Sequence, residues 1–217
     1  ADVVRALGKI YDAGHIEKGE KPVHWCQDCG SALAEAEVEY KDKTSKSIDV
    51  SFEADKESIS KLKDIFNTNK PESISFVIWT TTPWTIPSNV AVCINAELDY
   101  SLINVDDTHV VIASEMIDEC MERWGKVGTE ISKVPGKLIS DIQLLHPFLD
   151  RKSVLLHGDH VTTETGTGCV HTAPAHGVDD HLICKKNNIK PIKAMNSLGF
   201  FKDEIDFLKG LPAVKAD

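Results

Sequence analysis

The chain has 217 residues, 41% of them hydrophobic and 27% charged, which is the composition of a soluble globular protein. Its formal net charge of −10, with arginine only at positions 5, 123 and 151, argues against a nucleic-acid binder held by charge alone. There is no apolar run near the ~20 residues of a membrane span, no signal-peptide pattern, and one Cys-x-x-Cys among otherwise scattered cysteines, which favours a reducing, cytoplasmic setting.

Two local patterns mark the first forty residues. Apolar side chains on one face predict a helix over 2–13, which Gly14 ends. Cys26 and Cys29 have the spacing of half a zinc knuckle, but a structural zinc site needs four ligands and the sequence has no second pair of this kind. Two interpretations stay open. The cysteines are either free thiols in a turn or part of a site whose other ligands lie outside this sequence.

The next segment alternates between strand and helix patterns. Strict alternation over 47–53 predicts a half-buried strand, and residues 56–66 suit a helix. Residues 76–79 form a strongly apolar strand, and after an interruption by two prolines residues 90–94 resume as a strand.

The first apolar strand ends in three consecutive threonines, Thr80, Thr81 and Thr82. At a strand end their hydroxyls and backbone N–H groups are available for binding, although β-branched threonines also favour strands for purely structural reasons. Trp79 and Trp84 are either core residues or stacking surfaces for a base or a ribose, and core is the default for Trp79.

Short elements continue to the end of the chain. We expect a hairpin of 98–104 with 108–113, a helix over 114–124, and strands over 127–133 and 153–157. The tail from residue 190 has no strong period. Many short strands with few helices predict an α+β domain centred on a curled or barrel-like sheet.

Residues 166–180, GTGCVHTAPAHGVDD, combine glycines, a proline, two histidines and two aspartates in a way that core packing does not require. The pattern predicts a short buried strand, a tight loop and the start of a helix. His171, His176 and Asp180 then converge on one cavity. The alternatives are a structural role for His176 and a helix-capping role for Asp179 or Asp180. We interpret three further histidines as ordinary surface or strand residues: His109, His146 and His157.

A second hypothesis is a metal-dependent hydrolase whose ligands are His171, His176, Asp180 and His181. The spacings of these residues do not reproduce a known ligand pattern.

Three long motifs, in this order, carry a resemblance to a known family: KPVHWCQDCGSALAEAEVEY, WTTTPWTIPSNVAV and GTGCVHTAPAHGVDD. Together they resemble the editing insertion, connective polypeptide 1, of the class I isoleucyl-tRNA synthetases, and the match covers nearly the whole chain. The HIGH and KMSKS signatures of the aminoacylation domain are absent. The resemblance implies the fold of valyl, isoleucyl and leucyl editing domains, a barrel-like and mainly antiparallel β core with flanking helices. It divides the chain into an N-terminal connecting arm with the Cys-x-x-Cys knuckle (1–40), an editing domain (41–194) and a C-terminal connecting arm (195–217).

The activity implied by the resemblance is post-transfer editing, the hydrolysis of valine wrongly esterified to tRNA(Ile). Double-sieve editing is a known property of this family. The fragment is then an aminoacyl-tRNA deacylase without an aminoacylation site, ATP binding being confined to the full-length protein. Its implied partners are the 3′ end of tRNA(Ile) carrying valine, valine or valyl-adenylate as a small ligand, and the rest of the synthetase in cis. We expect a monomer in the cytoplasm, no membrane contact and no cofactor in this fragment, while zinc is allowed in the full-length protein. A non-catalytic tRNA-binding module is the third hypothesis, which the acidic charge balance disfavours.

The resemblance assigns catalytic roles to Thr80, Thr81, Thr82 and Asp180, and substrate-binding roles to Trp79, Trp84, Asn89, His171 and Asp179. A carboxylate is the natural anchor for the free ammonium of an aminoacyl ester, and a bulky imidazole sets the floor of a pocket that refuses isoleucine. Water attacks the ester directly, so donors that stabilise the developing oxyanion matter most. The ribose hydroxyl of the tRNA is a candidate general base.

Overall fold

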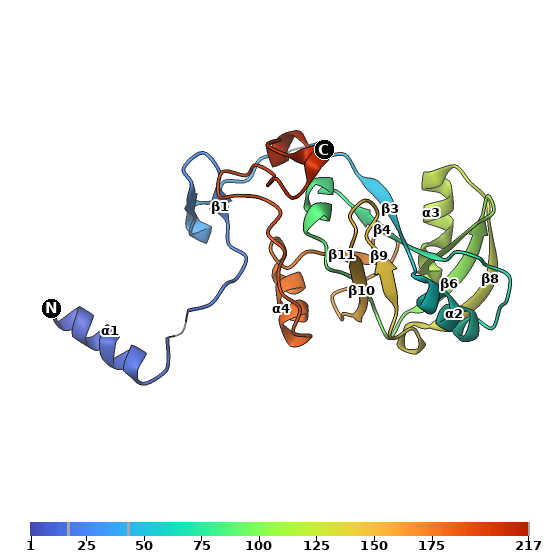
Figure 1. Ribbon diagram of the computed structural model, residues 1–217, viewed down its shortest axis with the longest axis horizontal. Coiled ribbons are helices and arrows are strands. Elements are labelled where there is room, and N and C mark those ends of the chain that lie inside the picture. The colour runs from blue at the N-terminus through green and yellow to red at the C-terminus, as the bar shows by residue number, and fades with distance from the viewer. Residues whose placement is uncertain (17, 43, 217) are drawn as a thin grey trace.

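The computed structural model describes residues 1–16, 18–42 and 44–216 (Figure 1). The α-helices are α1 (Asp2–Asp12), α2 (Lys56–Ile65), α3 (Ile117–Trp124) and α4 (Val178–Lys186). The strands are β1 (Trp25–Cys26), β2 (Ser31–Ala32), β3 (Ile48–Glu53), β4 (Ser75–Thr80), β5 (Ala91–Ile94), β6 (Asp99–Val105), β7 (Thr108–Ala113), β8 (Gly128–Pro135), β9 (Gln143–Leu145), β10 (Lys152–His157) and β11 (Val170–Thr172). Short 3-10 helices are η1 (Glu35–Glu37), η2 (Pro83–Ser88), η3 (Ser114–Met116), η4 (Gly136–Leu138), η5 (Asp206–Leu208) and η6 (Ala213–Lys215).

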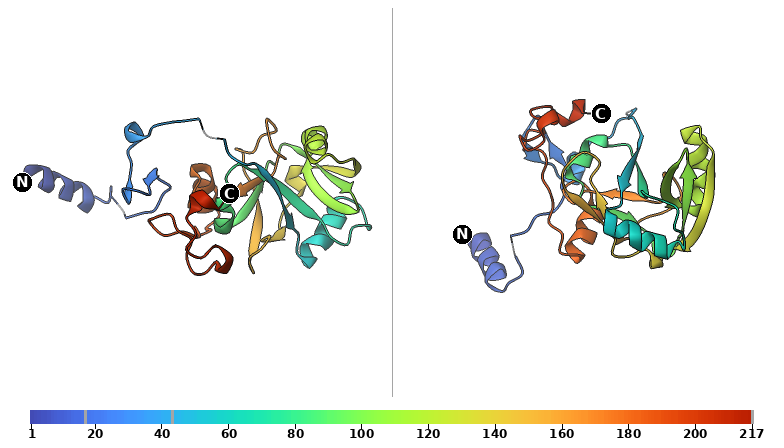
Figure 2. Two further views of the ribbon diagram at one scale, coloured as in Figure 1. Left: turned by 90° about the horizontal axis from the view of Figure 1, so that it is seen from above. Right: turned by 45° about the vertical axis from the view of Figure 1, so that its right-hand side comes forward.

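Two curved sheets form the body of the protein (Figures 1 and 2). One has the strand order β3-β4-β7-β6-β8 and the other the order β11-β5-β10-β9. Within these sheets the pairs β4–β7 and β5–β10 are parallel and the other pairs are antiparallel. At one edge of the four-stranded sheet, β11 packs beside β4 of the five-stranded sheet. At its other edge, a bridge between Ala54, which follows β3, and Leu144 on β9 also joins the two sheets. The predicted α+β fold with a barrel-like, mainly antiparallel core is confirmed.

A buried tyrosine ties the core to the loop that precedes β11. Tyr100 on β6 is fully buried, and its hydroxyl donates to the carbonyl of Gly168 at 2.7 Å and accepts from the N–H of Asn95 at 2.9 Å. Gly168 has φ +71°, and a Cβ at this position would collide with the side chain of Ala113. Only glycine therefore lets the loop lie against β7 at this point.

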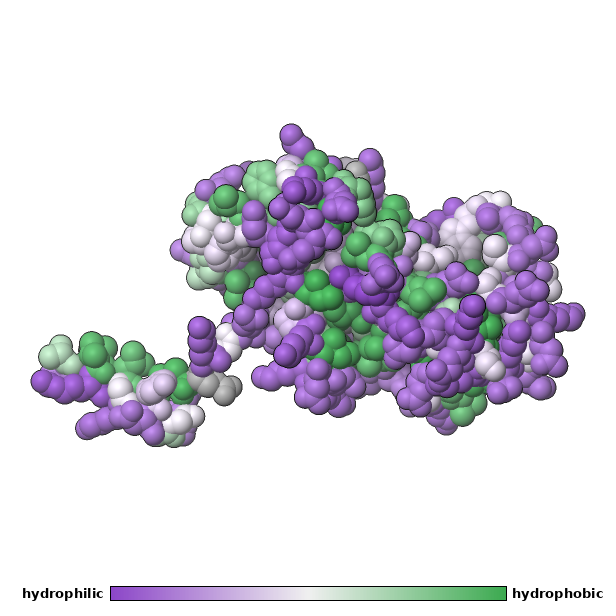
Figure 3. All heavy atoms as spheres, in the orientation of Figure 1, coloured by the Kyte–Doolittle hydropathy of each residue, from purple (hydrophilic) through white to green (hydrophobic). Residues whose placement is uncertain are grey.

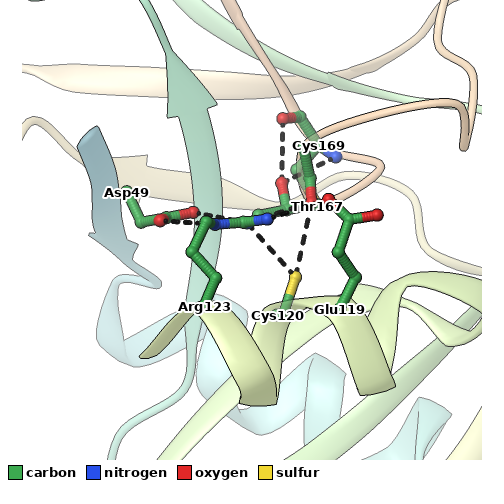
Figure 4. A network of polar contacts seen from close by, with 7 residues as sticks. Asp49, Glu119, Cys120, Arg123, Thr167 and Cys169 are labelled. Carbon is green, nitrogen blue, oxygen red and sulfur yellow. Dashed lines mark hydrogen bonds and ion pairs between the residues drawn. The ribbon is translucent and has the colours of Figure 1, made fainter. Parts of the chain in front are cut away.

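An arginine on α3 holds the same loop at a second carbonyl (Figure 4). The guanidinium of Arg123 makes two hydrogen bonds to Asp49 on β3, at 2.9 and 3.0 Å, and its Nη2 donates to the carbonyl of Gly166 at 3.1 Å. The thiol of Cys120 lies 3.4 Å from the same carbonyl. Helix α3, strand β3 and the loop before β11 are thus joined by one charged group.

The N-terminal helix stands apart from the sheets (Figures 1 and 2). Helix α1 has no buried residue, and its apolar side chains lie along one exposed face that is visible in Figure 3. The predicted helix is confirmed, but its apolar face has no cover among the described residues. None of the described helices is both long and apolar enough to cross a membrane.

The C-terminal tail is more ordered than its sequence indicates. Four of its side chains form a small core of their own: Ala194, Phe201, Ile205 and Ala213. Trp84 and Leu149 pack against this cluster, and the β1–β2 hairpin contacts the tail because Trp25 Nε1 donates to the carbonyl of Ser197 at 2.6 Å. The tail thereby covers one side of η2. The domain boundaries at residues 40 and 195 stay a prediction.

His146 corrects another expectation from the sequence, since it is neither a surface nor a strand residue. It is 5% exposed, its Nε2 donates to the carbonyl of Ile86 at 2.9 Å, and its Nδ1 accepts the N–H of Leu149 at 3.2 Å. Its ring also lies edge-on to Phe52 and Phe148. His146 therefore fastens η2 to the segment that connects β9 and β10.

Two turn positions with positive φ give a paired test of the fold. Gly125 ends α3 at φ +62° with open space around it, and Asp107 in the β6–β7 turn has φ 63°. Gly125→Ala should lower the free energy of unfolding by about 1–2 kcal/mol, because a side chain is strained in this conformation. Asp107→Gly should relieve the same strain and raise it by roughly 0.5 kcal/mol. Urea denaturation measures both, and two changes of the same sign would contradict this account.

Candidate functional site

A cavity of about 330 Å³ lies where the end of β4, the helix η2, the strand β11 and the first turn of α4 meet. It forms because β11 pairs with β5 and packs beside β4, which brings together two segments that are far apart in the sequence. The cavity is lined by Trp79, Thr80, Thr81, Thr82, Trp84, Thr85, Val170, His171, Ala173, His176, Gly177 and Asp180.

The residues predicted for the site do not all lie in the cavity. Asn89 is fully buried and lies behind His171, so it does not contact the cavity itself. Asp179 is exposed in the first turn of α4 and is also absent from the lining. The other predicted residues surround the cavity, while their chemical roles stay predictions. The sequence interpretation missed Thr85, which belongs to the same WTTTPWT motif, and the small wall residues Val170 and Ala173.

Both ring nitrogens of His171 are occupied by protein partners. Nε2 lies 2.9 Å from Thr85 Oγ1, and Nδ1 lies 2.8 Å from Asn89 Nδ2. Burial lowers the pKa of His171 to about 3, so the ring is neutral at pH 7. A ring with both nitrogens engaged keeps one orientation and has no free nitrogen for a substrate proton or a metal ion. His171 is therefore a fixed surface of the cavity.

The three threonines differ in their surroundings. Thr80 is buried, and its Oγ1 accepts the backbone N–H of Thr82 at 3.1 Å. This contact closes a tight turn at the end of β4. Thr81 and Thr82 are exposed and line the cavity, and Thr82 Oγ1 lies 3.3 Å from Thr80 Oγ1. Thr80 thus shapes the turn that presents the other two.

Asp180 is a half-buried carboxylate at the start of α4. Its Oδ2 accepts the backbone N–H of Ala173 at 2.8 Å, and a Cβ on Gly177 would lie 2.7 Å from its Cγ, so the carboxylate folds back over a residue that has no side chain. Burial raises the pKa of Asp180, because the charged form is desolvated. Asp180 forms no salt bridge with any described residue. Such a carboxylate is stabilised when a cation enters the cavity.

His176 and Trp84 form one side of the cavity. The Nε2 atom of His176 lies 3.0 Å from Ser88 Oγ, and its ring meets that of Trp84 edge-on at a centroid distance of 5.3 Å. Burial lowers the pKa of His176. Trp84 also packs against the C-terminal cluster, while Trp79, the default core residue, is half-buried and faces the cavity.

The described residues do not bring three or more His, Cys, Asp or Glu side chains together in a way that could hold a metal ion. The hypothetical ligand set of His171, His176, Asp180 and His181 therefore has no supporting geometry. Cys26 and Cys29 lie in the β1–β2 hairpin, where the N–H of Cys29 donates to the sulfur of Cys26 at 3.3 Å and lowers the pKa of that thiol. This hydrogen bond favours the thiolate of Cys26, the form that binds zinc. Contact with Cys26 raises the pKa of the Cys29 thiol, and the hairpin supplies two ligands at most.

Comparison with known proteins adds to this geometry. Residues 1–197 match the family described as tRNA synthetases class I (I, L, M and V). The chain is 47% identical to the isoleucine–tRNA ligase of Thioalkalivibrio sulfidiphilus over 211 residues, which is 97% of this chain and 22% of the relative. It is 45% identical to that of Pseudoalteromonas atlantica over 224 residues, covering 100% of this chain and 24% of the relative. The chain thus spans about a quarter of the length of the curated relatives it matches.

Solved structures show the same fold. The crystal structure of GlLeuRS-CP1 superposes with a TM-score of 0.55 at 14% identity, over 67% of this chain and 65% of that chain. The editing domain of the P. knowlesi cytosolic leucyl-tRNA synthetase gives 0.53 at 11% identity, over 69% of each chain.

The lowered pKa values of His146 and His171 predict a loss of stability in acid. Burial lowers the pKa of His146 to about 4 and that of His171 to about 3, from an ordinary value of 6.5. Below pH 6.5 the unfolded chain therefore binds protons that the folded chain refuses, so the free energy of unfolding falls as the pH falls. At pH 5 the loss is at most about 2 kcal/mol for each histidine. Urea denaturation of His171→Gln should show a weaker pH dependence between pH 7 and pH 5 than the parent, and equal slopes would contradict the neutral state of His171.

Proposed function

Because this chain belongs to the class I tRNA synthetases, the family that includes isoleucine–tRNA ligase, we propose that it is an editing domain that hydrolyses valine from mischarged tRNA(Ile). The observation that carries the proposal is the pairing of an uncompensated carboxylate, Asp180, with an immobile ring, His171, across one small cavity. The carboxylate suits the ammonium of an amino acid, and the ring limits the length of its side chain.

The charge of Asp180 explains how an aminoacyl ester is held. One carboxylate oxygen accepts the N–H of Ala173, and no described Lys, Arg or His side chain forms a salt bridge with Asp180. An α-ammonium group fits this position, because its positive charge offsets the desolvation that raises the pKa of Asp180. Thr81 and Thr82 then face the ester and the terminal ribose.

Selection against isoleucine has to come from repulsion. Valine and isoleucine differ by one methylene, which is worth about 0.8 kcal/mol of apolar transfer and always favours the larger side chain. A rigid wall reverses this preference, because overpacking costs about 1–3 kcal/mol. We assign the wall to His171, whose ring is held at both nitrogens.

The hydrolysis needs no protein nucleophile. The oxygen of a water molecule attacks the ester carbonyl carbon, and the ester oxygen leaves with a proton as the ribose hydroxyl, which releases valine. His171 does not serve as the base, because its Nε2 and Nδ1 are both bonded. We assign that role to the vicinal ribose hydroxyl of the tRNA, and we assign stabilisation of the oxyanion to hydroxyl and backbone donors of the threonine turn.

The partners follow from this chemistry. The substrate is the 3′ end of tRNA(Ile) carrying valine, and free valine or valyl-adenylate is a candidate small ligand. With a net charge of −10 the chain depends on the rest of the synthetase to bind the tRNA body. A role in protein synthesis implies a cytoplasmic location, and the six free cysteines fit the reducing conditions of that compartment.

The anchor role of Asp180 has a direct test. Asp180→Asn keeps an oxygen that can accept the N–H of Ala173 but removes the charge, so the fold should persist. Losing a charge-assisted contact of about 1.5–3 kcal/mol should slow deacylation of Val-tRNA(Ile) roughly ten- to hundredfold. Asp179→Asn, outside the cavity, should lose much less. Unchanged hydrolysis by Asp180→Asn, or equal losses in the two variants, would contradict the anchor.

The wall role of His171 predicts a gain of activity. His171→Ala should make room for the extra methylene, so that the variant hydrolyses Ile-tRNA(Ile), which the parent spares, while it keeps much of its action on Val-tRNA(Ile). The measurement is the release of labelled amino acid from both charged tRNAs. If the folded variant still spares Ile-tRNA(Ile), the wall lies elsewhere, and if the parent releases neither amino acid, the protein is a non-catalytic module.

A further inference from the structure

We infer that Ser153, a buried serine outside the cavity, is a positioning residue that sets the selectivity of the site through Asn89 and His171. The inference rests on the proposed function but concerns a different part of the molecule. Ser153 lies on β10, is fully buried and does not line the cavity.

A continuous series of hydrogen bonds joins Ser153 to the wall. Its hydroxyl donates to Asn89 Oδ1 at 2.6 Å. The Nδ2 of Asn89 donates to the carbonyl of Ala91 at 2.8 Å and lies 2.8 Å from His171 Nδ1. The parallel pairing of β10 with β5 places Val154 opposite Ala91, which brings Ser153 within reach of Asn89.

The direction of these bonds follows from their two ends. Thr85 Oγ1 uses its single proton on the carbonyl of Thr82, at 2.9 Å, so it accepts a proton from His171 Nε2. At the other end, Asn89 accepts from Ser153 on Oδ1 and donates to Nδ1 of the ring. Both ends require the same species, a neutral His171 with its proton on Nε2.

Ser153 supplies the hydrogen bond that Asn89 Oδ1 accepts. Among the described residues, its hydroxyl is the hydrogen-bond donor to Asn89 Oδ1, and both residues are fully buried. Without that hydroxyl, Asn89 holds a buried acceptor with no partner, and its amide shifts toward the space that the hydroxyl leaves. The contact to His171 Nδ1 then loosens, and the ring no longer keeps one position against the cavity.

A looser ring changes selectivity more than turnover. Valine does not press on the wall, whereas isoleucine is refused only while the wall is rigid. Ser153→Ala should therefore lower the ratio of kcat/KM for Val-tRNA(Ile) to that for Ile-tRNA(Ile) by about three- to tenfold, with a smaller change in kcat/KM for Val-tRNA(Ile) itself.

The chain offers a matched control in the other sheet. Ser101 on β6 is also fully buried, and its hydroxyl donates to Glu130 Oε2 at 2.9 Å and lies 2.7 Å from Ser114 Oγ. Ser101→Ala removes a comparable buried hydroxyl without touching the site. Both variants should lose stability in urea denaturation, but only Ser153→Ala should lose selectivity. An unchanged ratio in Ser153→Ala, or an equal change in Ser101→Ala, would overturn the inference.

A spectroscopic measurement tests the same inference without activity. Nitrogen-15 NMR of the imidazole in the 217-residue chain should show the Nε2–H form of His171 from pH 8 to pH 5, and Ser153→Ala should move its Nδ1 resonance whereas Ser101→Ala should not. If Ser153→Ala does not fold, Ser153→Cys, whose S–H is a much weaker donor to Asn89 Oδ1, takes its place in both experiments, with smaller changes in the same direction expected. A Nδ1 resonance that is the same in parent and variant would overturn the inference. A parent that shows the expected tautomer but releases no valine would instead overturn the proposed function.

Discussion

The pairing of β11 with β5 is the contact on which the site depends. It sets His171 opposite Val92, and a shift by one residue would turn the imidazole to the other face of the sheet and away from Asn89 and Thr85. A strand of three residues cannot fix its own register, so the preceding loop does so. The hydroxyl of Tyr100 holds one carbonyl of that loop, and Arg123 holds another. The position of the cavity wall is therefore determined by the core and by α3.

Burial patterns explain why much of the fold could be predicted from the sequence. The elements with a strong period in the sequence are present where expected, including β3, α2, the β6–β7 hairpin and α3. Strand β3 and the two helices bury one face, which leaves a repeating pattern in the sequence, whereas consecutive residues are buried along β6 and β7. The tail was not predicted because its apolar residues meet across loops, in contacts with no fixed spacing. His146 was missed for a related reason, since its acceptor on Ile86 is sixty residues away in the sequence.

The candidate site was predictable in its residues but not in its arrangement. The two motifs contain the residues that line the cavity, because such a cavity is built from residue types that a core does not require. The motifs could not show which residues line the cavity and which residues hold the lining residues in place. Asn89 positions His171, and Thr80 positions the backbone of Thr82. Thr85 is hydrogen-bonded to the ring of His171, although the sequence interpretation singled out only its neighbours. Which side chain faces the cavity depends on the pairing of distant strands, and this information is absent from any single motif.

A wall made of a hydrogen-bonded ring differs mechanically from one made of hydrocarbon. Leucine or phenylalanine at the position of His171 would be kept in place by dispersion forces, which vary little when a side chain rotates by a few degrees. Hydrogen bonds at both ends of an imidazole resist such rotation, because they weaken steeply with angle. The polar ring thus gives the cavity stiffness rather than volume. A stiff wall limits how far the cavity can adapt to a larger side chain.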